Sequence, residues 1–519
     1  MDQNARVFGE MFTQLAALHP TRPALRDKSG TNVSFGAFNR RINRLNHAVA
    51  QRGLKQGDRV AILAKNSLAY VELFGLTKTG IVIVPLNWRL SLTELQALVA
   101  HCQPRIIFAD DEFLATALAV QNNRASMVVA MGSGAPDVLP LSALSETGTD
   151  QEPQSSVAPD DPLCIIYTSG TTGAPKGVLH THRTALDNMR VSSHAAQGLG
   201  PGDRVMAVMP LFHIGGLLLH FFSAFSAGCT TTLLTEFSPR SVLETIRDHR
   251  ISNVHLVPTM IAAVLDRYDA APVDVSTLKT ILYAASPIPS TLLRRALITL
   301  PDCGFVQSYG ATESGMVTVL SAQQHIAAHD ADTARILMSC GQPVADRAVR
   351  VIADGRPCPP DAIGEIEVKS PGVMAGYWKN SAASGAAVTD GWLKTGDLGY
   401  IDENGFIYIV DRKNDMIITG GENVYPTEVE EHLCRLDGVA AAAVFGLPDP
   451  RWVEKVAAAI VTAPGAALSG TAVMEAIRSE LAAYKCPKSV FFLAELPKNA
   501  TGKVLRKELR QMALSGEIV

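Results

Sequence analysis

The sequence lacks the charge patterns of nucleic-acid-binding, membrane-anchored and secreted proteins. Only 18% of its 519 residues are charged, and 46 Lys and Arg against 50 Asp and Glu give a formal net charge of −4. There is no basic excess for nucleic acid and no polybasic run for an anionic membrane. The first residues also lack the basic-then-apolar layout of a signal peptide. We therefore expect no nucleic-acid partner and a cytoplasmic location.

Other absences narrow the class of protein further. The eight cysteines include no C-x-x-C pair, which indicates reduced core thiols rather than a disulfide or zinc framework. The most apolar stretch, 205–234, is interrupted by Pro210, His213 and several glycines, so it predicts buried helices and strands and no transmembrane helix. No G-x-S-x-G elbow of a serine hydrolase occurs.

The chain has the composition and length of a globular protein with two or more domains. Apolar residues make up 47% of it, and 519 residues exceed one ordinary core. Through the first four hundred residues, apolar runs such as 127–130 and 281–284 alternate with helical patterns, which predicts parallel sheets covered on both faces. Period-2 segments at 365–369 and 406–410, with a turn at 402–405, predict an antiparallel hairpin.

After residue 411 the pattern changes to a compact α+β unit. Helical spacing recurs near 427–436 and at 473–483. We expect an α/β protein with an N-terminal domain at 1–411 and a C-terminal domain at 412–519. The five polar residues at 411–415 lie between two apolar runs and predict an interdomain hinge.

The segment most informative about function is 167–177, which has the sequence YTSGTTGAPKG and follows the apolar run 163–166. It predicts a loop that leaves a buried strand with backbone N–H groups free to face an anion. Glycine permits close approach of the backbone, hydroxyls donate hydrogen bonds, and Lys176 adds a point charge. The spacing differs from the NTPase P-loop, G-x-x-x-x-G-K-[ST]. A flexible Gly/Thr surface loop is the alternative.

Six further motifs follow along the chain. They are PLFHIGG at 210–216, AASPIP at 284–289, SYGATES at 308–314, LKTGDL at 393–398, VDRKNDMIITGGENVYP at 410–426 and PKNATGKVLR at 497–506. A buried carboxylate is costly unless it is paired, so Glu313 in an otherwise uncharged segment predicts a cation partner. Taken singly, His213 also fits a core histidine, Asp397 a turn residue, and Lys503 a solvated surface lysine.

In this order the motifs resemble those of the adenylate-forming superfamily, which includes acyl-CoA synthetases, luciferases and peptide-synthetase adenylation domains. The resemblance covers nearly the whole chain. It implies large parallel-rich sheets flanked by helices, a β-barrel-like subdomain and a small mobile C-terminal domain. It also implies an AMP-forming acid–thiol ligase that uses ATP, Mg²⁺ and coenzyme A. Such an enzyme converts a carboxylic acid to an acyl adenylate with release of pyrophosphate, and then to acyl-CoA and AMP.

The resemblance assigns roles to individual residues. Lys503 would be the catalytic lysine, while Glu313 and Thr168 would act in catalysis and hold Mg²⁺. Asn414 occupies the hinge position, where the family usually has Asp or Lys. The nucleotide- and CoA-binding residues would be Ser169, Gly170, Thr171, Thr172, Gly173, Lys176, Ala285, Ser286, Tyr309, Gly310, Thr312, Asp397, Arg412, Gly420 and Gly421. The acyl pocket would be formed by His213, which would also act in catalysis, and by Ala284, Gly310 and Met316.

The acid itself is less well defined. The segment 210–216 has no aspartate to hold an amino group, so a monocarboxylic acid with an uncharged tail is favoured. The chain looks most like medium-chain fatty-acid and aryl or phenylpropenoate CoA ligases, and a homodimer is compatible with the family. Loading of a separate acyl carrier protein is the first alternative. A non-catalytic nucleotide-binding relative is the second, and the intact Glu313, Asp397, Arg412 and Lys503 argue against it.

Overall fold

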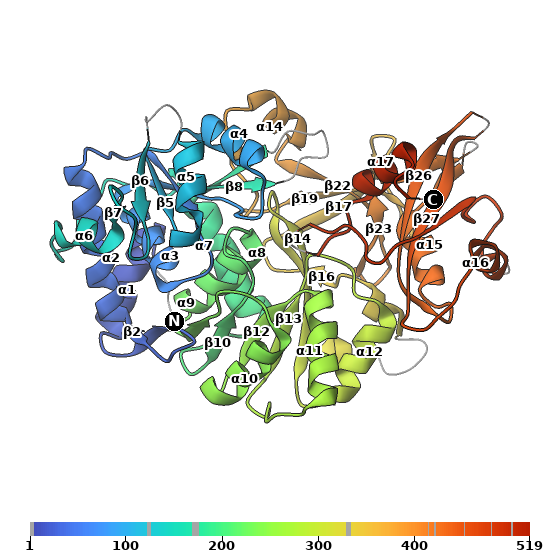
Figure 1. Cartoon of the computed structure of the whole chain (residues 1–519), viewed down its shortest axis with the longest axis horizontal. Helices are drawn as coiled ribbons and strands as arrows, with labels where there is room; N and C mark the ends of the chain where they lie inside the picture. The colour runs from blue at the N-terminus through green and yellow to red at the C-terminus, as the bar shows by residue number, and fades with distance from the viewer. Residues whose placement is uncertain are drawn as a thin grey trace.

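The computed structural model describes residues 5–121, 126–168, 176–327, 334–413, 415–419, 422–450, 452–478, 480–499 and 502–518. Two large sheets, a smaller antiparallel sheet and a C-terminal α+β unit make up the chain (Figure 1). The expected α/β class is confirmed. Within these ranges, no helix combines the length and the apolar character needed to cross a bilayer.

The first large sheet has eight strands, of which six are parallel. In spatial order they are β20 (Gly376–Tyr377), β9 (Lys176–Thr181), β8 (Pro162–Thr168), β4 (Val82–Pro85), β3 (Arg59–Leu63), β5 (Ile106–Ala109), β6 (Met127–Ala130) and β7 (Leu139–Pro140). Strands β9 and β20 add an antiparallel edge. Helices α4 (Leu92–Cys102) and α5 (Leu114–Val120) pack on its outer face.

The second large sheet has nine strands and is also mainly parallel. In order they are β16 (Gln342–Pro343), β15 (Gly315–Leu320), β14 (Gly304–Ala311), β13 (Thr280–Tyr283), β12 (Asn253–Leu256), β10 (Arg204–Ala207), β11 (Thr230–Leu233), β1 (Pro23–Arg26) and β2 (Asn32–Ser34). Its outer face is covered by α10 (Pro239–His249), α11 (Pro258–Ala270) and α12 (Ser290–Thr299). The apolar run predicted at 281–284 forms β13, shifted by one residue.

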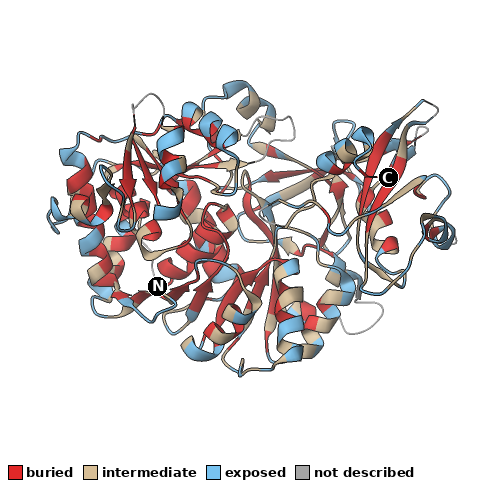
Figure 2. Ribbon diagram, in the orientation of Figure 1, coloured by how far each residue is buried: buried red, intermediate tan, exposed pale blue. Residues whose placement is uncertain are grey.

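A layer of helices lies between the two sheets. It contains α1 (Phe8–Leu18), α2 (Phe35–Gln51), α7 (His182–Val191) and the π-helix Leu217–Phe222. Six phenylalanines of this layer belong to one buried core that also includes residues of both sheets. Figure 2 shows the buried residues concentrated on the strands and on the faces of the helices that contact them. The remaining N-terminal helices are α3 (Leu68–Leu73), α6 (Leu141–Glu146), α8 (Ile214–Gly216), α9 (Ser223–Ser226), α13 (Ala322–Ala327) and α14 (Ser381–Ala387).

The third sheet corrects the predicted hairpin. It contains β18 (Arg356–Pro357), β17 (Ala348–Ala353), β19 (Gly364–Lys369), β22 (Trp392–Ile401), β21 (Val388–Thr389) and β23 (Ile407–Arg412). The turn at 402–405 joins β22 to β23, whereas the predicted partner at 365–369 lies on the other side of β22. Alternation identified both strands as half-buried, but alternation carries no information about which strand lies between them.

The C-terminal unit is a five-stranded sheet with helices. Its strands are β25 (Glu422–Val424), β24 (Ile417–Thr419), β27 (Val453–Thr462), β26 (Val439–Asp449) and β28 (Ser489–Phe492), and its helices are α15 (Pro426–Leu433), α16 (Gly470–Ile477) and α17 (Arg506–Ser515). The helix predicted at 473–483 ends at Ile477. Leu481 still packs against the core because a turn continues the chain, with Leu481 N donating to Ile477 O at 3.0 Å.

Candidate active site

The candidate site begins where the parallel strands of the two large sheets end. Ligand sites in α/β proteins lie at the carboxyl ends of the strands. Here Thr168 ends β8, residues 284–286 follow β13, and the Glu313 turn follows β14. Thr168 and Lys176 are opposite each other in the antiparallel register of β8 and β9, so they mark the two ends of the loop predicted to bind phosphate.

Glu313 lies in the turn between β14 and β15, and both sheets hold it there. The hydroxyl of Tyr377 donates to Glu313 Oε1 at 3.1 Å, and Nε2 of His180 lies 2.9 Å from the carbonyl oxygen of Thr312. Lys176 Nζ lies 5.0 Å from the centre of the Tyr377 ring. Tyr377 therefore joins the carboxylate predicted to hold the metal to the lysine predicted to hold phosphate.

The turn itself depends on small residues. A Cβ on Gly310 would lie 1.9 Å from the carbonyl oxygen of Gly315. Gly315 has φ of 64°, and a Cβ there would overlap the amide of Asn188. Asn188 in turn accepts from the backbone N–H of Met316 at 3.2 Å. Gly310, which the resemblance assigned to the nucleotide and acyl sites, is thus also required by the hairpin, as is Gly315.

Asp397 on β22 forms the centre of a second cluster. Tyr309 donates its hydroxyl to Asp397 Oδ2 at 2.6 Å, and Arg412 Nε lies 2.6 Å from Oδ1. Asp397 and Arg412 are direct partners in the register of β22 and β23. Burial raises the pKa of Asp397, and the charge of Arg412 and the Tyr309 hydroxyl oppose that rise.

Lys503 approaches this cluster from the C-terminal unit. A tight turn presents it, since Lys503 N donates to Asn499 Oδ1 at 2.9 Å and its carbonyl accepts from Asn499 N at 2.8 Å. Gly502 has φ of 81°, and a Cβ there would lie 3.1 Å from Thr259 Oγ1 at the start of α11. Burial and the charge of Arg412 lower the pKa of Lys503, whereas Asp415 and Asp397 raise it.

His213 and the loop after β13 are the remaining described positions that the sequence predicted for the site. His213 directly precedes α8, and within the described residues its Nε2 is buried without a hydrogen-bond partner. Burial and the charge of Arg89 lower the pKa of His213 to about 4, so the imidazole is neutral near pH 7. Ala285 has φ of 75°, a left-handed conformation that costs about 1–2 kcal/mol for an L residue. Such strain concentrates at functional sites.

The oxygen donors present fit a magnesium ion carried by a nucleotide. Mg²⁺ takes oxygen ligands and is commonly bound by one or two carboxylates together with substrate phosphates and water. Glu313 supplies a carboxylate and Thr168 a hydroxyl, and one Glu313 oxygen already accepts from Tyr377. The described ranges contain no cluster of three His, Cys, Asp or Glu side chains able to enclose a metal, which a nucleotide-borne ion does not need.

Comparison with known proteins agrees with this arrangement. Residues 12–378 match the AMP-binding enzyme family, and residues 428–503 match the AMP-binding enzyme C-terminal domain. This chain belongs to the AMP-binding enzyme family. It is an acid–thiol ligase of the adenylate-forming superfamily.

Three relatives show how far the likeness extends along this AMP-binding enzyme. The fatty acid–[acyl-carrier-protein] ligase ScoC of Streptomyces coeruleorubidus is 37% identical over 507 residues, which cover 96% of this chain and 95% of that protein. A feruloyl-CoA synthase of an Amycolatopsis species is 36% identical over 97% of this chain and 98% of its own. The o-succinylbenzoate CoA synthetase of Bacillus subtilis, solved with its acyl-adenylate intermediate, has a TM-score of 0.85 at 31% identity, covering 96% and 97% of the chains.

The structure brings several of the predicted residues together, and others lie outside the described residues. Tyr309, Asp397, Arg412 and Lys503 converge, and Glu313 lies near Lys176 through Tyr377. The predicted residues Ser169, Gly170, Thr171, Thr172, Gly173, Asn414, Gly420 and Gly421 lie outside the described residues. Met316 is fully buried and packs in a core with Val306 and Leu282. The catalytic and binding roles remain predictions.

Two residues near the site were missed by sequence reasoning. Tyr377 lies in the short strand β20, and His180 lies on β9, three residues after the phosphate-loop segment. Neither belongs to a motif that indicates chemistry by itself. Their importance depends on contacts with Glu313 and Thr312, more than sixty residues away in the chain. A glycine followed by two aromatic residues at 376–378 was the one local signal.

Proposed function

We propose that this AMP-binding enzyme is an ATP-dependent acid:CoA ligase. In the first half-reaction a carboxylate oxygen attacks the α-phosphorus of ATP, the bond to the β-phosphate breaks, and pyrophosphate leaves. In the second, the thiol sulfur of coenzyme A attacks the acyl carbon and AMP leaves. The observation that carries the proposal is the convergence of Tyr309, Asp397 and Arg412 with Lys503 from the C-terminal unit.

Each group in this cluster suits the first half-reaction. Two anions must meet, so the site has to supply cations and oriented donors. Lys503 and Arg412 supply positive charge, and the Asp397 carboxylate can accept hydrogen bonds from ribose hydroxyls. Glu313 and Thr168 would hold Mg²⁺, which when bound stabilises negative charge on the phosphates. Removal of one such contact typically costs about 10²–10³-fold in rate.

Two neutral imidazoles support an uncharged, hydrogen-bonding acyl group. His255 on β12 lies behind Gly215, with its Cε1 at 3.3 Å from the position of a Cβ on that glycine. Both His255 ring nitrogens are buried, and within the described residues neither makes a well-formed hydrogen bond; the Gly215 backbone is the polar group that raises the pKa of this ring. Burial and the neighbouring His220 lower the pKa of His255 to about 3.

A substrate that forms hydrogen bonds with these imidazoles is favoured over one that leaves them without a hydrogen-bond partner. An unsatisfied buried polar group costs about 1–3 kcal/mol. Of the medium-chain fatty acids and the aryl or phenylpropenoic acids, the hydroxylated aryl acids place a hydrogen-bonding group at the far end of the acyl part. We therefore place them first. The neutral His213 and His255 supply no charge for a second carboxylate.

Loading of a separate acyl carrier protein is the second candidate. The relative at 37% identity is named as an acyl-carrier-protein ligase, and the carrier thiol would react as the CoA thiol does. The eight cysteines are all free, which suits a reducing compartment, and we propose that the enzyme acts in the cytoplasm.

The test measures pyrophosphate release with ATP and Mg²⁺ for octanoate, palmitate, benzoate, coumarate, ferulate and cinnamate, with and without CoA. The proposal predicts CoA-dependent turnover, with coumarate about tenfold above cinnamate, because cinnamate lacks the hydroxyl and leaves a buried imidazole unpaired. Release that a carrier protein stimulates and CoA does not would support the second candidate. No release with any acid would contradict both.

A further inference from the structure

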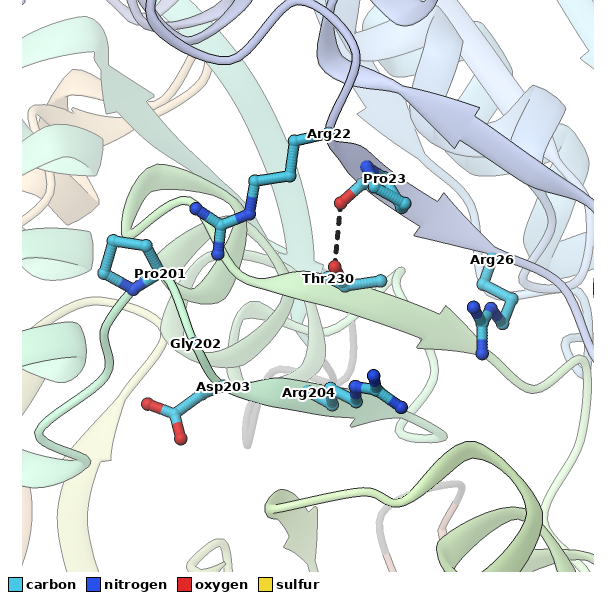
Figure 3. Close-up of a pocket in the computed structure, with 8 residues that line it drawn as sticks. All are labelled: Arg22, Pro23, Arg26, Pro201, Gly202, Asp203, Arg204 and Thr230. Atoms are coloured by element: carbon cyan, nitrogen blue, oxygen red, sulfur yellow. Dashed lines mark hydrogen bonds between the residues drawn. The ribbon is translucent and has the colours of Figure 1, made fainter.

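A surface pocket lies at the edge of the nine-stranded sheet opposite to the active site. It has a volume of about 230 Å³ and is lined by the amino ends of β10 and β11 and by β1 from Pro23 to its last residue, Arg26 (Figure 3). These strands run parallel to β13 and β14, whose carboxyl ends carry the candidate catalytic groups. A ligand in this pocket would therefore be separated from the site of adenylation by the length of the sheet.

Three arginines line this pocket against a single carboxylate. Arg22, Arg26 and Arg204 contribute the guanidinium groups, and Asp203 is the acidic residue (Figure 3). The Asp203 carboxylate already has three partners: Lys279 Nζ at 3.0 Å, Ser252 Oγ at 3.1 Å and the backbone N–H of Gly200 at 3.0 Å. Lys279 balances its charge, so the three guanidinium groups leave the pocket with an excess of positive charge.

The hydrogen bonds of Arg26 and Arg204 go to neutral oxygens. Arg26 Nε donates to Asn32 Oδ1 at 2.8 Å, and Arg204 donates to the carbonyl of His249 at 3.3 Å. Both arginines act on the imidazole of His249. Its pKa is lowered first by burial, then by the charge of Arg26, and to a smaller extent by the charge of Arg204. Because both positive charges act on one imidazole, they lie in the same region of the surface, where an anion would be attracted to both.

The nearby acids are engaged elsewhere. Asp248 and Asp27 raise the pKa of His249, so their charge reaches this region. Asp248 pairs with Arg247 at 2.6 Å, and Asp27 accepts from Ser29 Oγ at 2.6 Å. Asp27 also accepts from the backbone N–H of Thr31 at 2.9 Å.

The floor of the pocket is open enough for a compact ligand. A Cβ on Gly202 would meet nothing within 4 Å. Thr230 Oγ1 donates to the carbonyl of Pro23 at 2.8 Å, which fixes the starts of β1 and β11 relative to each other. Arg26 and Arg204 therefore project from strands of this sheet, and Arg22 directly precedes β1.

We propose that this pocket, lined by Arg22, Arg26 and Arg204, binds a compact phosphate-bearing anion. Guanidinium groups match phosphate oxygens in paired, charge-assisted hydrogen bonds, and arginine clusters are the usual protein partners of phosphate. Orthophosphate, pyrophosphate and the diphosphate of a nucleotide share this chemistry. The site is distinct from the ATP site and does not depend on the proposed ligase activity.

The test is calorimetric titration of the full-length protein with phosphate, pyrophosphate and ADP, each at constant ionic strength. The variant Arg26→Gln/Arg204→Gln removes two positive charges from the pocket. Its matched control is Arg183→Gln/Arg295→Gln, which removes two charges from surface ion pairs elsewhere. A third variant, Lys176→Gln/Lys503→Gln, removes binding at the predicted catalytic phosphate site.

The proposal predicts binding of at least one of the three anions that persists in Lys176→Gln/Lys503→Gln and weakens about tenfold or more in Arg26→Gln/Arg204→Gln. The surface control should bind as the wild type does, and the anion with the highest affinity identifies the source. Binding lost only with the two lysines, binding that survives loss of Arg26 and Arg204, or equal weakening in the surface control would each overturn it. Absence of any binding to the wild type would do the same.

Discussion

Replacement of Asp397 by Asn should lower activity strongly while changing the free energy of unfolding only slightly. The carboxylate is buried between the Tyr309 hydroxyl and Arg412, each at 2.6 Å. Burial raises the pKa of Asp397 despite these partners, so the ionised form is less favourable in the fold than in the unfolded chain. The ionised carboxylate therefore lowers stability at neutral pH, and this contribution becomes more favourable as pH falls toward 3.8.

The two expected magnitudes differ widely. Asn removes the desolvation cost of a buried charge, and the Arg412 side chain is 39% exposed and retains hydration. The free energy of unfolding should change by no more than about 1–2 kcal/mol. At the proposed ribose contact, Asn cannot form two charge-assisted hydrogen bonds, which would contribute up to about 3–6 kcal/mol of binding, or roughly 10²–10⁴-fold in kcat/KM for ATP.

Urea unfolding and ATP-dependent pyrophosphate release would measure these quantities. Asp361→Asn is the matched control, because Asp361 pairs with Arg335 on the surface and should leave both nearly unchanged. An Asp397→Asn protein with normal kcat/KM for ATP would refute the ribose assignment. A loss of more than about 3 kcal/mol in stability would refute the electrostatic reasoning.

Three other predictions follow from the site. Lys503→Ala should abolish adenylation but spare thioester formation from supplied acyl-AMP, and equal loss of both half-reactions would contradict separate roles for the two steps. Tyr377→Phe should raise the Mg²⁺ concentration that gives the half-maximal rate by about tenfold, because Glu313 loses a hydrogen bond that orients it. The rate is measured as a function of Mg²⁺ concentration with Glu313→Gln as the reference variant, and an unchanged Mg²⁺ dependence would count against this prediction. Acid should destabilise the fold between about pH 6.5 and 4, because buried histidines stay neutral in the fold and take up protons when it unfolds; urea unfolding across this range should show the loss, and a flat profile would contradict it. These histidines are His180, His182, His213 and His220, with pKa values lowered to about 4, and His255, lowered to about 3.

Local patterns in the sequence predicted the parallel strands well. The run 127–130 is β6 itself, and the run 281–284 overlaps β13, because a strand covered on both faces is apolar throughout. Motif order also placed Tyr309, Asp397, Arg412 and Lys503 in one site, and the structure brings them together. These residues are far apart in the chain, so no propensity argument alone would have grouped them.

Contacts across elements were beyond the reach of the sequence. The position of β22 between β19 and β23 is set by side-chain packing on the third sheet, which periodicity does not encode. Tyr377 matters because β20 pairs with β9 and so points a hydroxyl at Glu313. Met316 was predicted to line the acyl pocket because it follows the 308–314 motif, and every residue of β15 is buried. Its side chain packs in a core, and its pocket role stays a prediction.

The electrostatics of Lys503 suggest why the C-terminal unit would hold one position before adenylation and leave it afterwards. Burial and Arg412 lower the pKa of Lys503, so its charge at the site depends on nearby anions. Asp397 and Asp415 supply part of that compensation, and ATP would add more until pyrophosphate departs with most of the negative charge. At the predicted hinge, Lys413 pairs with Glu365, but the Lys413 side chain is 56% exposed. Such an exposed ion pair contributes only about 0–1 kcal/mol, so it does little to fix the position of the C-terminal unit. Loss of the phosphate charge would then remove the main electrostatic attraction that keeps Lys503 in place, which would favour release of the lysine before the thiol step.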